Sequence, residues 1–162
     1  MPFVQQDDQK GPAMKNHAAI AEEKFGGGYN CAQSVLFSFC EELGLDADTA
    51  LKIACGFGAG MGRKGEVCGA VSGGVMVLGL KYGRGEKEER AQTDATYAKI
   101  RELIDRFCAK HGSCICRELL SGCNLATPEG QTYYWENQCF NGICRPCVRD
   151  AAEIVADLLA IR

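Results

Sequence analysis

Residues 97–108, Tyr-Ala-Lys-Ile-Arg-Glu-Leu-Ile-Asp-Arg-Phe-Cys, carry the clearest helical pattern in this chain of 162 residues. Apolar side chains recur there at steps of three and four residues, at Tyr97, Ile100, Leu103, Ile104, Phe107 and Cys108. This spacing places them on one face of an α-helix, where they can pack against a core. The charged run 84–90 that precedes them is expected to be the solvated start of this long helix.

Outward from this stretch, helical periodicity continues while strand signals stay weak. It predicts helices around residues 14–25, 30–39, 66–82 and 146–159, with shorter ones around 46–54 and 113–120. Residues 56–65 are expected to form a glycine-rich loop, and residues 123–145 are expected to be irregular. We therefore expect an all-α fold, a single compact domain of about six helices over residues 13–162, after a loose leader at residues 1–12.

Composition limits the classes of function. Apolar residues make up 46% and charged residues 24% of the chain, which is the balance of a folded globular protein. The net charge of −3 argues against nucleic acid or an anionic membrane as the main partner. The most apolar segment, residues 67–80, is too short to span a membrane, and residues 1–10 do not resemble a secretory signal. We expect a cytoplasmic protein.

Cysteine is the residue type that departs most from an ordinary composition. The chain has 11 cysteines, an odd number that internal disulfides alone cannot pair. In a cytoplasmic protein thiols stay reduced, so a cysteine-rich chain is expected to bind metal or to use thiols in catalysis.

Four cysteines share a position that the others lack, because each is expected in the first turn of a helix. Cys31 follows the N-cap residue Asn30, and Cys68 follows the loop that ends at Gly65. Cys116 is expected to follow a cap at Ser113, and Cys147 follows Pro146. Unpaired N–H groups and the helix dipole favour the thiolate there, and the thiolate is both the nucleophile and the metal ligand. If the four helix starts converge, they would form one site for a metal–thiolate cluster.

A second arrangement competes for the metal. Cys139, Cys144 and Cys147 have the Cys-x4-Cys-x2-Cys spacing of the plant-type iron–sulfur loop, for which Cys123 is a candidate fourth ligand. Cys144 and Cys147 are also half of a zinc site. Cys139 and Cys144 are therefore secondary candidates. His111 is a candidate ligand too, although a histidine near a helix C-terminus is the more common interpretation.

The remaining cysteines are expected to be structural. Cys40, Cys55 and Cys108 lie on apolar faces near helix ends, where cysteine acts as a small apolar residue. Cys114 and Cys123 have no assigned role. Covalent haem is not expected, because no Cys-x-x-Cys-His stretch occurs.

The context of the four cysteines resembles the C_GCAxxG_C_C family of redox-active proteins, which is similar to the helical domain of split-Soret cytochromes. The matching stretches are Gly-Tyr-Asn-Cys-Ala-Gln at 28–33, Gly-Phe-Gly-Ala-Gly-Met-Gly at 56–62, Cys-Gly-Ala-Val-Ser-Gly at 68–73, Cys-Arg-Glu-Leu-Leu at 116–120 and Cys-Val-Arg-Asp-Ala-Ala at 147–152. The resemblance implies an iron–sulfur cluster held by Cys31, Cys68, Cys116 and Cys147.

Three functions follow as alternatives. The first is electron transfer or redox sensing by an iron–sulfur protein that exchanges electrons with an unknown partner. The second is a metal-free thiol–disulfide protein with Cys68 as the nucleophile and Cys31, Cys116 or Cys147 as the resolving thiol. The third is a structural zinc or other metal-binding protein. Helices with glycine on one face also suggest a homodimer.

Overall fold

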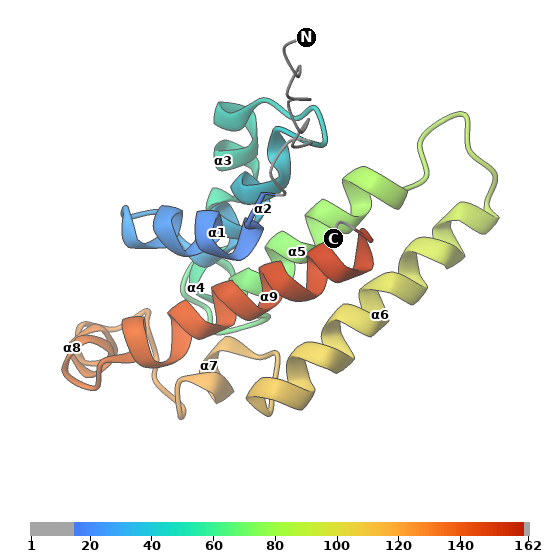
Figure 1. The fold of residues 1–162 in the computed structure, drawn as a ribbon. Helices are drawn as coiled ribbons and strands as arrows, with labels where there is room; N and C mark the ends of the chain where they lie inside the picture. Colours follow the sequence, from blue (N-terminus) through green and yellow to red (C-terminus); the bar gives the residue numbers. More distant parts are fainter. Residues whose placement is uncertain (1–14, 161–162) are drawn as a thin grey trace, which may run out of the picture.

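The computed structural model describes residues 15–160, and these fold into helices joined by short loops (Figure 1). Within that range the helices are α1 (His17–Gly26), α2 (Cys31–Cys40), α3 (Ala47–Cys55), α4 (Gly58–Met61), α5 (Gly69–Tyr82), α6 (Ala91–His111), α7 (Cys116–Leu119), α8 (Pro128–Glu136), the π-helix η1 (Phe140–Cys144) and α9 (Arg145–Leu158). The described residues contain no strand, only one isolated bridge between Val67 and Ile115. The predicted all-α class and the single compact domain are confirmed, with more helices than the six expected.

The core forms around α5, which packs against α2, α6 and α9. Its glycines allow this close packing. A Cβ atom at Gly73 would lie 2.7 Å from the Ala32 carbonyl oxygen of α2, and one at Gly74 would lie 2.9 Å from a Leu103 methyl of α6. Real Cβ atoms do not approach other atoms so closely, so the small residues of α5 set the distance to its neighbours.

The long helix predicted around residues 97–108 is α6, and its apolar stripe is buried only in part. Leu103 and Phe107 are fully buried against the core, and Ile100 and Ile104 pack at its edge. Tyr97 is 55% exposed, because the first half of α6 projects beyond α9 (Figure 1).

The largest difference from the expected fold lies in residues 123–145, which contain α8 and η1 instead of an irregular segment. Thr127 caps α8, since its side chain accepts a hydrogen bond from the Gly130 N–H, and Pro128 follows at the first helical position. Figure 1 shows α8 at one end of the molecule, next to the start of α9. The sequence shows both Thr127 and Pro128, which favour a helix start, but no apolar stripe follows them, so a helix was not expected here.

The glycine-rich segment after α3 turns in the left-handed sense. Five successive residues, Ala59, Gly60, Met61, Gly62 and Arg63, have φ between 53° and 69°. This conformation is costly for the three that carry a Cβ atom. A Cβ atom at residue 60 would lie 2.7 Å from the Cβ of Cys116, so glycine at this position allows the segment to pack directly against α7.

Two sequence expectations concern the ends of the chain and the membrane. The predicted leader, residues 1–12, lies outside the described residues. Among the helices that the structure describes, none combines the length and the apolar character that crossing a membrane requires.

Candidate functional site

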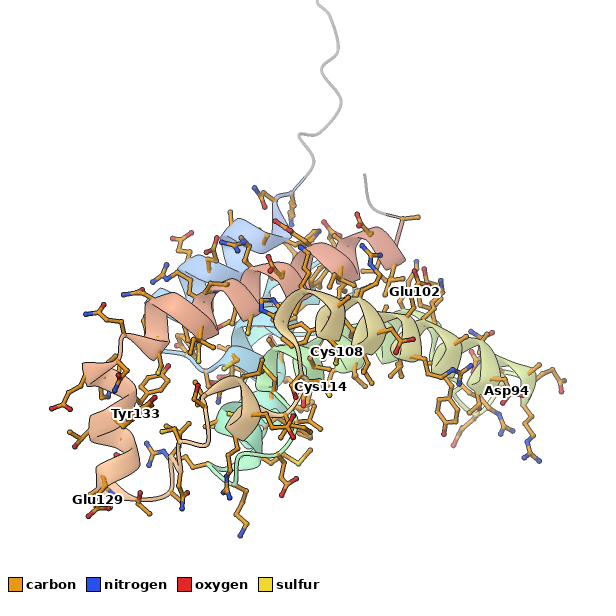
Figure 2. The ribbon with its side chains drawn as sticks, turned by 90° about the horizontal axis from the view of Figure 1, so that it is seen from below. Asp94, Glu102, Cys108, Cys114, Glu129 and Tyr133 are labelled. Carbon is orange, nitrogen blue, oxygen red and sulfur yellow. The ribbon has the colours of Figure 1, made fainter. Side chains whose placement is uncertain are left out.

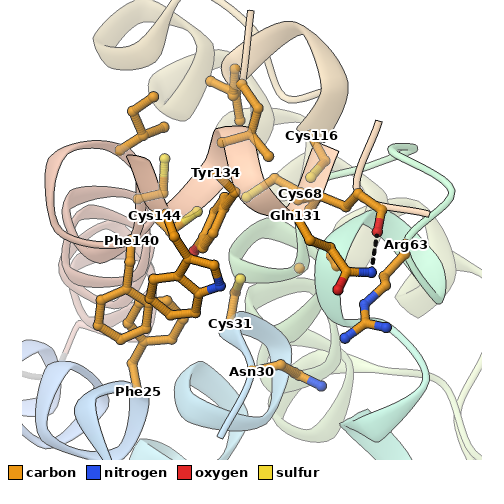
Figure 3. Close-up of a pocket in the computed structure, with 18 of the residues that line it drawn as sticks. Phe25, Asn30, Cys31, Arg63, Cys68, Cys116, Gln131, Tyr134, Phe140 and Cys144 are labelled. Carbon is orange, nitrogen blue, oxygen red and sulfur yellow. Dashed lines mark hydrogen bonds between the residues drawn. The ribbon is translucent and has the colours of Figure 1, made fainter. Parts of the chain in front are cut away.

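The four cysteines singled out by their sequence context line one cavity. The cavity has a volume of about 400 Å³ and lies between α2, α5, α7, α8 and the start of α9. Cys31, Cys68, Cys116 and Cys147 all contribute to its wall, and Cys144 is a fifth thiol there. Most of the other lining side chains are apolar or aromatic (Figure 3). The structure thus brings together residues that are more than a hundred positions apart in the sequence.

Each cysteine is positioned by a helix end, although not always as expected. Cys31 is the first residue of α2 after a full capping box, in which Asn30 and Gln33 exchange side-chain and backbone hydrogen bonds. Cys68 is the N-cap residue of α5, and Cys116 is the first residue of α7. Cys147 differs, because the helical chain runs from η1 into α9 and leaves no free helix start at residue 147.

The segments that carry Cys68 and Cys116 are joined directly. The Cys68 N–H donates to the Cys114 carbonyl at 2.7 Å, and the Cys116 N–H donates to the Glu66 carbonyl at 2.7 Å. These bonds flank the antiparallel bridge between residues 67 and 115. The sequence gives no sign of this pairing, because a bridge of one residue from each segment leaves no periodic pattern.

The expected cap at Ser113 is also different in the structure. The side chain of Ser113 accepts a hydrogen bond from the Ile115 N–H at 3.0 Å, and its hydroxyl donates to Glu118. It therefore orders the turn before α7, while Ile115 takes the N-cap position without a side-chain bond.

The cavity thiols form two contacting pairs. Cys31 lies next to Cys144, and Cys68 lies next to Cys147, close enough for the two thiols of each pair to affect each other's pKa. Tyr134 of α8 is a further neighbour of Cys144. Cys116 is the remaining thiol of the wall. It lies close enough to Cys68 and Cys144 for negative charge on either of them to raise its pKa.

The environment opposes loss of protons from these thiols. Interaction with the neighbouring Cys147 thiol, together with burial, holds the pKa of Cys68 well above its usual value. Burial raises the pKa of Cys116 to about 12, and contact with Cys31, followed by burial, raises the pKa of Cys144. The Cys147 thiol and burial at Cys68, and burial at Cys116, therefore outweigh the helix-start effect that was expected to favour the thiolate.

His111, a candidate ligand from the sequence, lies behind Cys147 and does not line the cavity. Its Nδ1 atom is 3.8 Å from the Cys147 Sγ, and its Nε2 atom is 3.0 Å from the Asp150 carboxylate. The second contact is a close ionic approach without hydrogen-bond alignment, since Nε2 has no hydrogen-bond partner among the described residues. Arg149 and Lys110 approach the same carboxylate at 3.1 and 3.7 Å.

The two secondary candidates separate in the structure. Cys144 lines the cavity, three residues before Cys147 and on the same side of the helical chain. Cys139 does not line it and is buried in a small apolar cluster with Cys116, Leu120 and Cys123. The Cys-x2-Cys spacing of Cys144 and Cys147 therefore identified a second thiol of the cavity, whereas the Cys-x4-Cys spacing pointed to Cys139, which lies outside it.

The other cysteines lie outside the cavity. Cys40 is buried as expected, but Cys55 is exposed and Cys108 is only half-buried. The Cys108 thiol contacts that of Cys114 where α6 ends (Figure 2). All eleven cysteines are free thiols.

The sequence suggests two kinds of metal site, an iron–sulfur cluster and a single zinc ion, and the arrangement of the thiols bears on both. Within residues 15–160, no three Cys, His, Asp or Glu side chains come close enough together to hold a single metal ion. The five thiols are instead spread along the wall of one cavity. An iron–sulfur cluster distributes its thiolate ligands over two or more irons, so spread thiols fit a cluster better than a mononuclear ion.

Comparison with known proteins adds one match. A family model described as "Putative redox-active protein (C_GCAxxG_C_C)" covers residues 29–158, most of the chain and all four cysteines. Searches of the curated proteins and of the solved structures found no match. The chain therefore belongs to the C_GCAxxG_C_C family of redox-active proteins.

Proposed function

We propose that this redox-active protein binds an iron–sulfur cluster through Cys31, Cys68, Cys116 and Cys147. The observation that carries the proposal is their convergence, because four cysteines from four separate segments line one cavity. Soft thiolates are the ligands that iron–sulfur clusters use. A bound cluster would supply one-electron transfer, for electron exchange with a partner or for redox sensing.

The protonation of the thiols supports a metal-binding site. Buried thiols with raised pKa values are neutral at pH 7, and Cys68 and Cys116 are of this kind. A metal-free thiol enzyme needs a thiolate at neutral pH. A metal supplies the positive charge that makes buried thiolates stable, and it releases their protons when it binds.

The surroundings of the thiols support the same proposal. The lining is mainly apolar, and an apolar shell limits the access of water to a cluster and tunes its potential. The left-handed segment passes beside Cys116, with Gly60 close to its Cβ. Glycine there brings the backbone to the thiol wall, as expected for a segment that shapes a cluster site.

A second candidate function is supported by the contacts between thiols. Cys31 and Cys144 are neighbours, and so are Cys68 and Cys147, as in a dithiol that can be oxidised to a disulfide. The raised pKa of Cys68 argues against the role of attacking thiolate that the sequence suggested for it. For this reason we rank the thiol–disulfide function below the cluster.

The test is the metal content of protein purified without oxygen. We expect brown protein with iron and acid-labile sulfide in equal amounts. The variant Cys68→Ser should lose most of the iron, while Cys55→Ser, which changes an exposed thiol outside the cavity, should keep it. Colourless protein with stoichiometric zinc would instead support a structural zinc site. Protein free of any metal, with a disulfide that forms and breaks, would support the second candidate.

A further inference from the structure

Part of the cavity wall is aromatic. Phe25 and Phe140 are stacked with their ring centroids 4.4 Å apart, and Trp135 stacks on Phe140 at 5.6 Å. In the view of Figure 3, Phe25 and Phe140 lie on the opposite side from Cys68 and Cys116. The cavity therefore offers aromatic rings away from Cys68 and Cys116, although Cys144 lies beside Phe140.

The aromatic stack ends on an open ring. Phe25 is 4% exposed, but Trp135 at the other end of the stack is 63% exposed. Tyr134 packs against the indole with the two rings at 86°, and Trp135 stays largely exposed despite its contacts with Tyr134 and Phe140. An exposed indole face at a cavity wall is the surface on which a planar ligand gains most by stacking.

The charge around the cavity has one sign. Arg63 is the one charged side chain among the described residues that line it, and neither Asp nor Glu lines it. Arg63 has no hydrogen bond or ion pair within residues 15–160, and Figure 3 shows it beside Gln131. Two more cations lie over the rings of residues that line the cavity: Lys24 Nζ is 4.3 Å from the Tyr29 ring centroid, and Arg145 Cζ is 5.6 Å from that of Phe140.

The volume leaves room for an organic molecule. The whole cavity, which the ligand would share with the proposed cluster, has a volume of about 400 Å³, within the range of small-molecule sites, roughly 300–1,000 Å³. Small-molecule sites combine an apolar lining with a few polar groups that orient the ligand. Gln131 is one such group: its amide N–H donates to the Leu125 carbonyl at 3.1 Å, which fixes the side chain.

We infer that this cavity binds a small planar organic anion, an aromatic or conjugated carboxylate, with its ring on Trp135 and its carboxylate at Arg63. The inference rests on the proposed function in that it names a ligand class for the same cavity. It uses residues of the aromatic wall and the rim, which are separate from the four cysteines.

The test measures binding to the full-length protein as isolated without oxygen, with trans-cinnamate as the probe. We expect one cinnamate per chain by calorimetry and a shift of the indole N–H signal in NMR spectra. Only one such signal exists, because Trp135 is the one tryptophan of the chain. Cinnamamide has the same planar shape without the charge, and acetate has the charge without the ring, so both should bind more weakly.

Two variants separate the charge from the ring. Arg63→Gln should weaken cinnamate binding about tenfold, the effect of losing one charge-assisted hydrogen bond, and leave cinnamamide unchanged. Trp135→Leu should weaken both probes. Lys64→Gln is the matched control, since it removes a neighbouring exposed charge that does not line the cavity.

The outcomes distinguish this inference from the proposed function, because iron and sulfide are measured on the same samples. Iron-free protein that still binds cinnamate through Arg63 would support the inference and overturn the cluster. Iron-loaded protein without millimolar binding of cinnamate would overturn the inference alone. Equal weakening by Lys64→Gln and Arg63→Gln would also overturn it, because attraction would then be a general effect of charge.

Discussion

At the scale of the residue, burial has a stronger effect on the cavity thiols than their position on a helix. The sequence predicts correctly that Cys31, Cys68 and Cys116 begin helices. It does not show that these thiols become buried beside other thiols, because that depends on how the helices pack. A helix start carries about half a positive charge. The stabilisation that this partial charge gives a thiolate is smaller than the free-energy cost of burying the thiolate in an apolar wall.

Alkylation of the metal-free protein tests whether burial or the helix start has the stronger effect on the pKa of Cys116. Since burial raises the pKa of this thiol to about 12, very little thiolate exists at pH 8, and iodoacetamide should react slowly. The thiolate fraction of such a group grows about tenfold with each pH unit below its pKa, so the rate should still be rising at pH 10. Mass spectrometry would give the rate at each cysteine, with exposed Cys55 as the fast reference. Rapid reaction of Cys116 that is complete and independent of pH above pH 8 would contradict the prediction.

Gly60 provides a second test at the residue scale, with Gly62 as the matched control. Both have positive φ, 66° and 58°, so alanine at either position costs about 1–2 kcal/mol in backbone strain. Only at residue 60 does the added Cβ also collide with other atoms, 2.6 Å from the Glu66 nitrogen. We expect Gly60→Ala to lower the free energy of unfolding in urea clearly more than Gly62→Ala. Equal losses would show that the segment shifts away from Cys116 without cost.

At the scale of the element, the sequence is informative where a helix has an apolar stripe. α6 has such a stripe and was predicted, whereas α8 has a cap and a proline but no stripe and was expected to be irregular. The four-residue helices α4 and α7 are too short to show periodicity. Contacts between elements, such as the bridge of Val67 with Ile115 or the approach of His111 to Cys147, depend on tertiary packing and have no local signal.

The capping box of α2 was predicted from the sequence and allows a test at the element scale. Asn30 accepts a hydrogen bond from the Gln33 N–H at 3.0 Å, and its amide donates to the Cys55 carbonyl at 2.8 Å. Asn30→Ala removes both bonds, so we expect the free energy of unfolding to fall by about 1–2 kcal/mol. The loss should also loosen the start of α2 that positions Cys31. Urea unfolding followed by circular dichroism would measure the change.

The control for this variant is Asn137→Ala, which removes an exposed asparagine whose amide donates to the Tyr133 carbonyl at the end of α8. We expect a change of less than about 0.5 kcal/mol there, because α8 lies at the edge of the fold. A comparable loss from both variants would mean that the cap of α2 has no special importance.

At the scale of the whole molecule, the core and the cavity have different origins. The core needs only helices with apolar faces, and the pattern of the sequence predicts most of it. The cavity needs the ends of α2, α5 and α7 and the start of α9 to meet at one place, while α8 covers it. The cavity thiols therefore come from elements that are far apart in sequence. A ligand that binds all of these thiols also links the elements that carry them.

This coupling predicts that removal of a cluster destabilises the whole fold. A group that binds only the folded state stabilises it by about 3 kcal/mol when its concentration is a hundred times its dissociation constant. In a chain of this size, a loss of that amount lowers Tm by roughly 6–12 °C. Scanning calorimetry without oxygen, before and after treatment with an iron chelator, would measure the shift. The Cys68→Ser protein is the control, since it should start with little iron and a low Tm, and chelation should change it no further. If chelation strips the iron from the natural protein but leaves its Tm unchanged, the metal is bound at the surface and not between the helices.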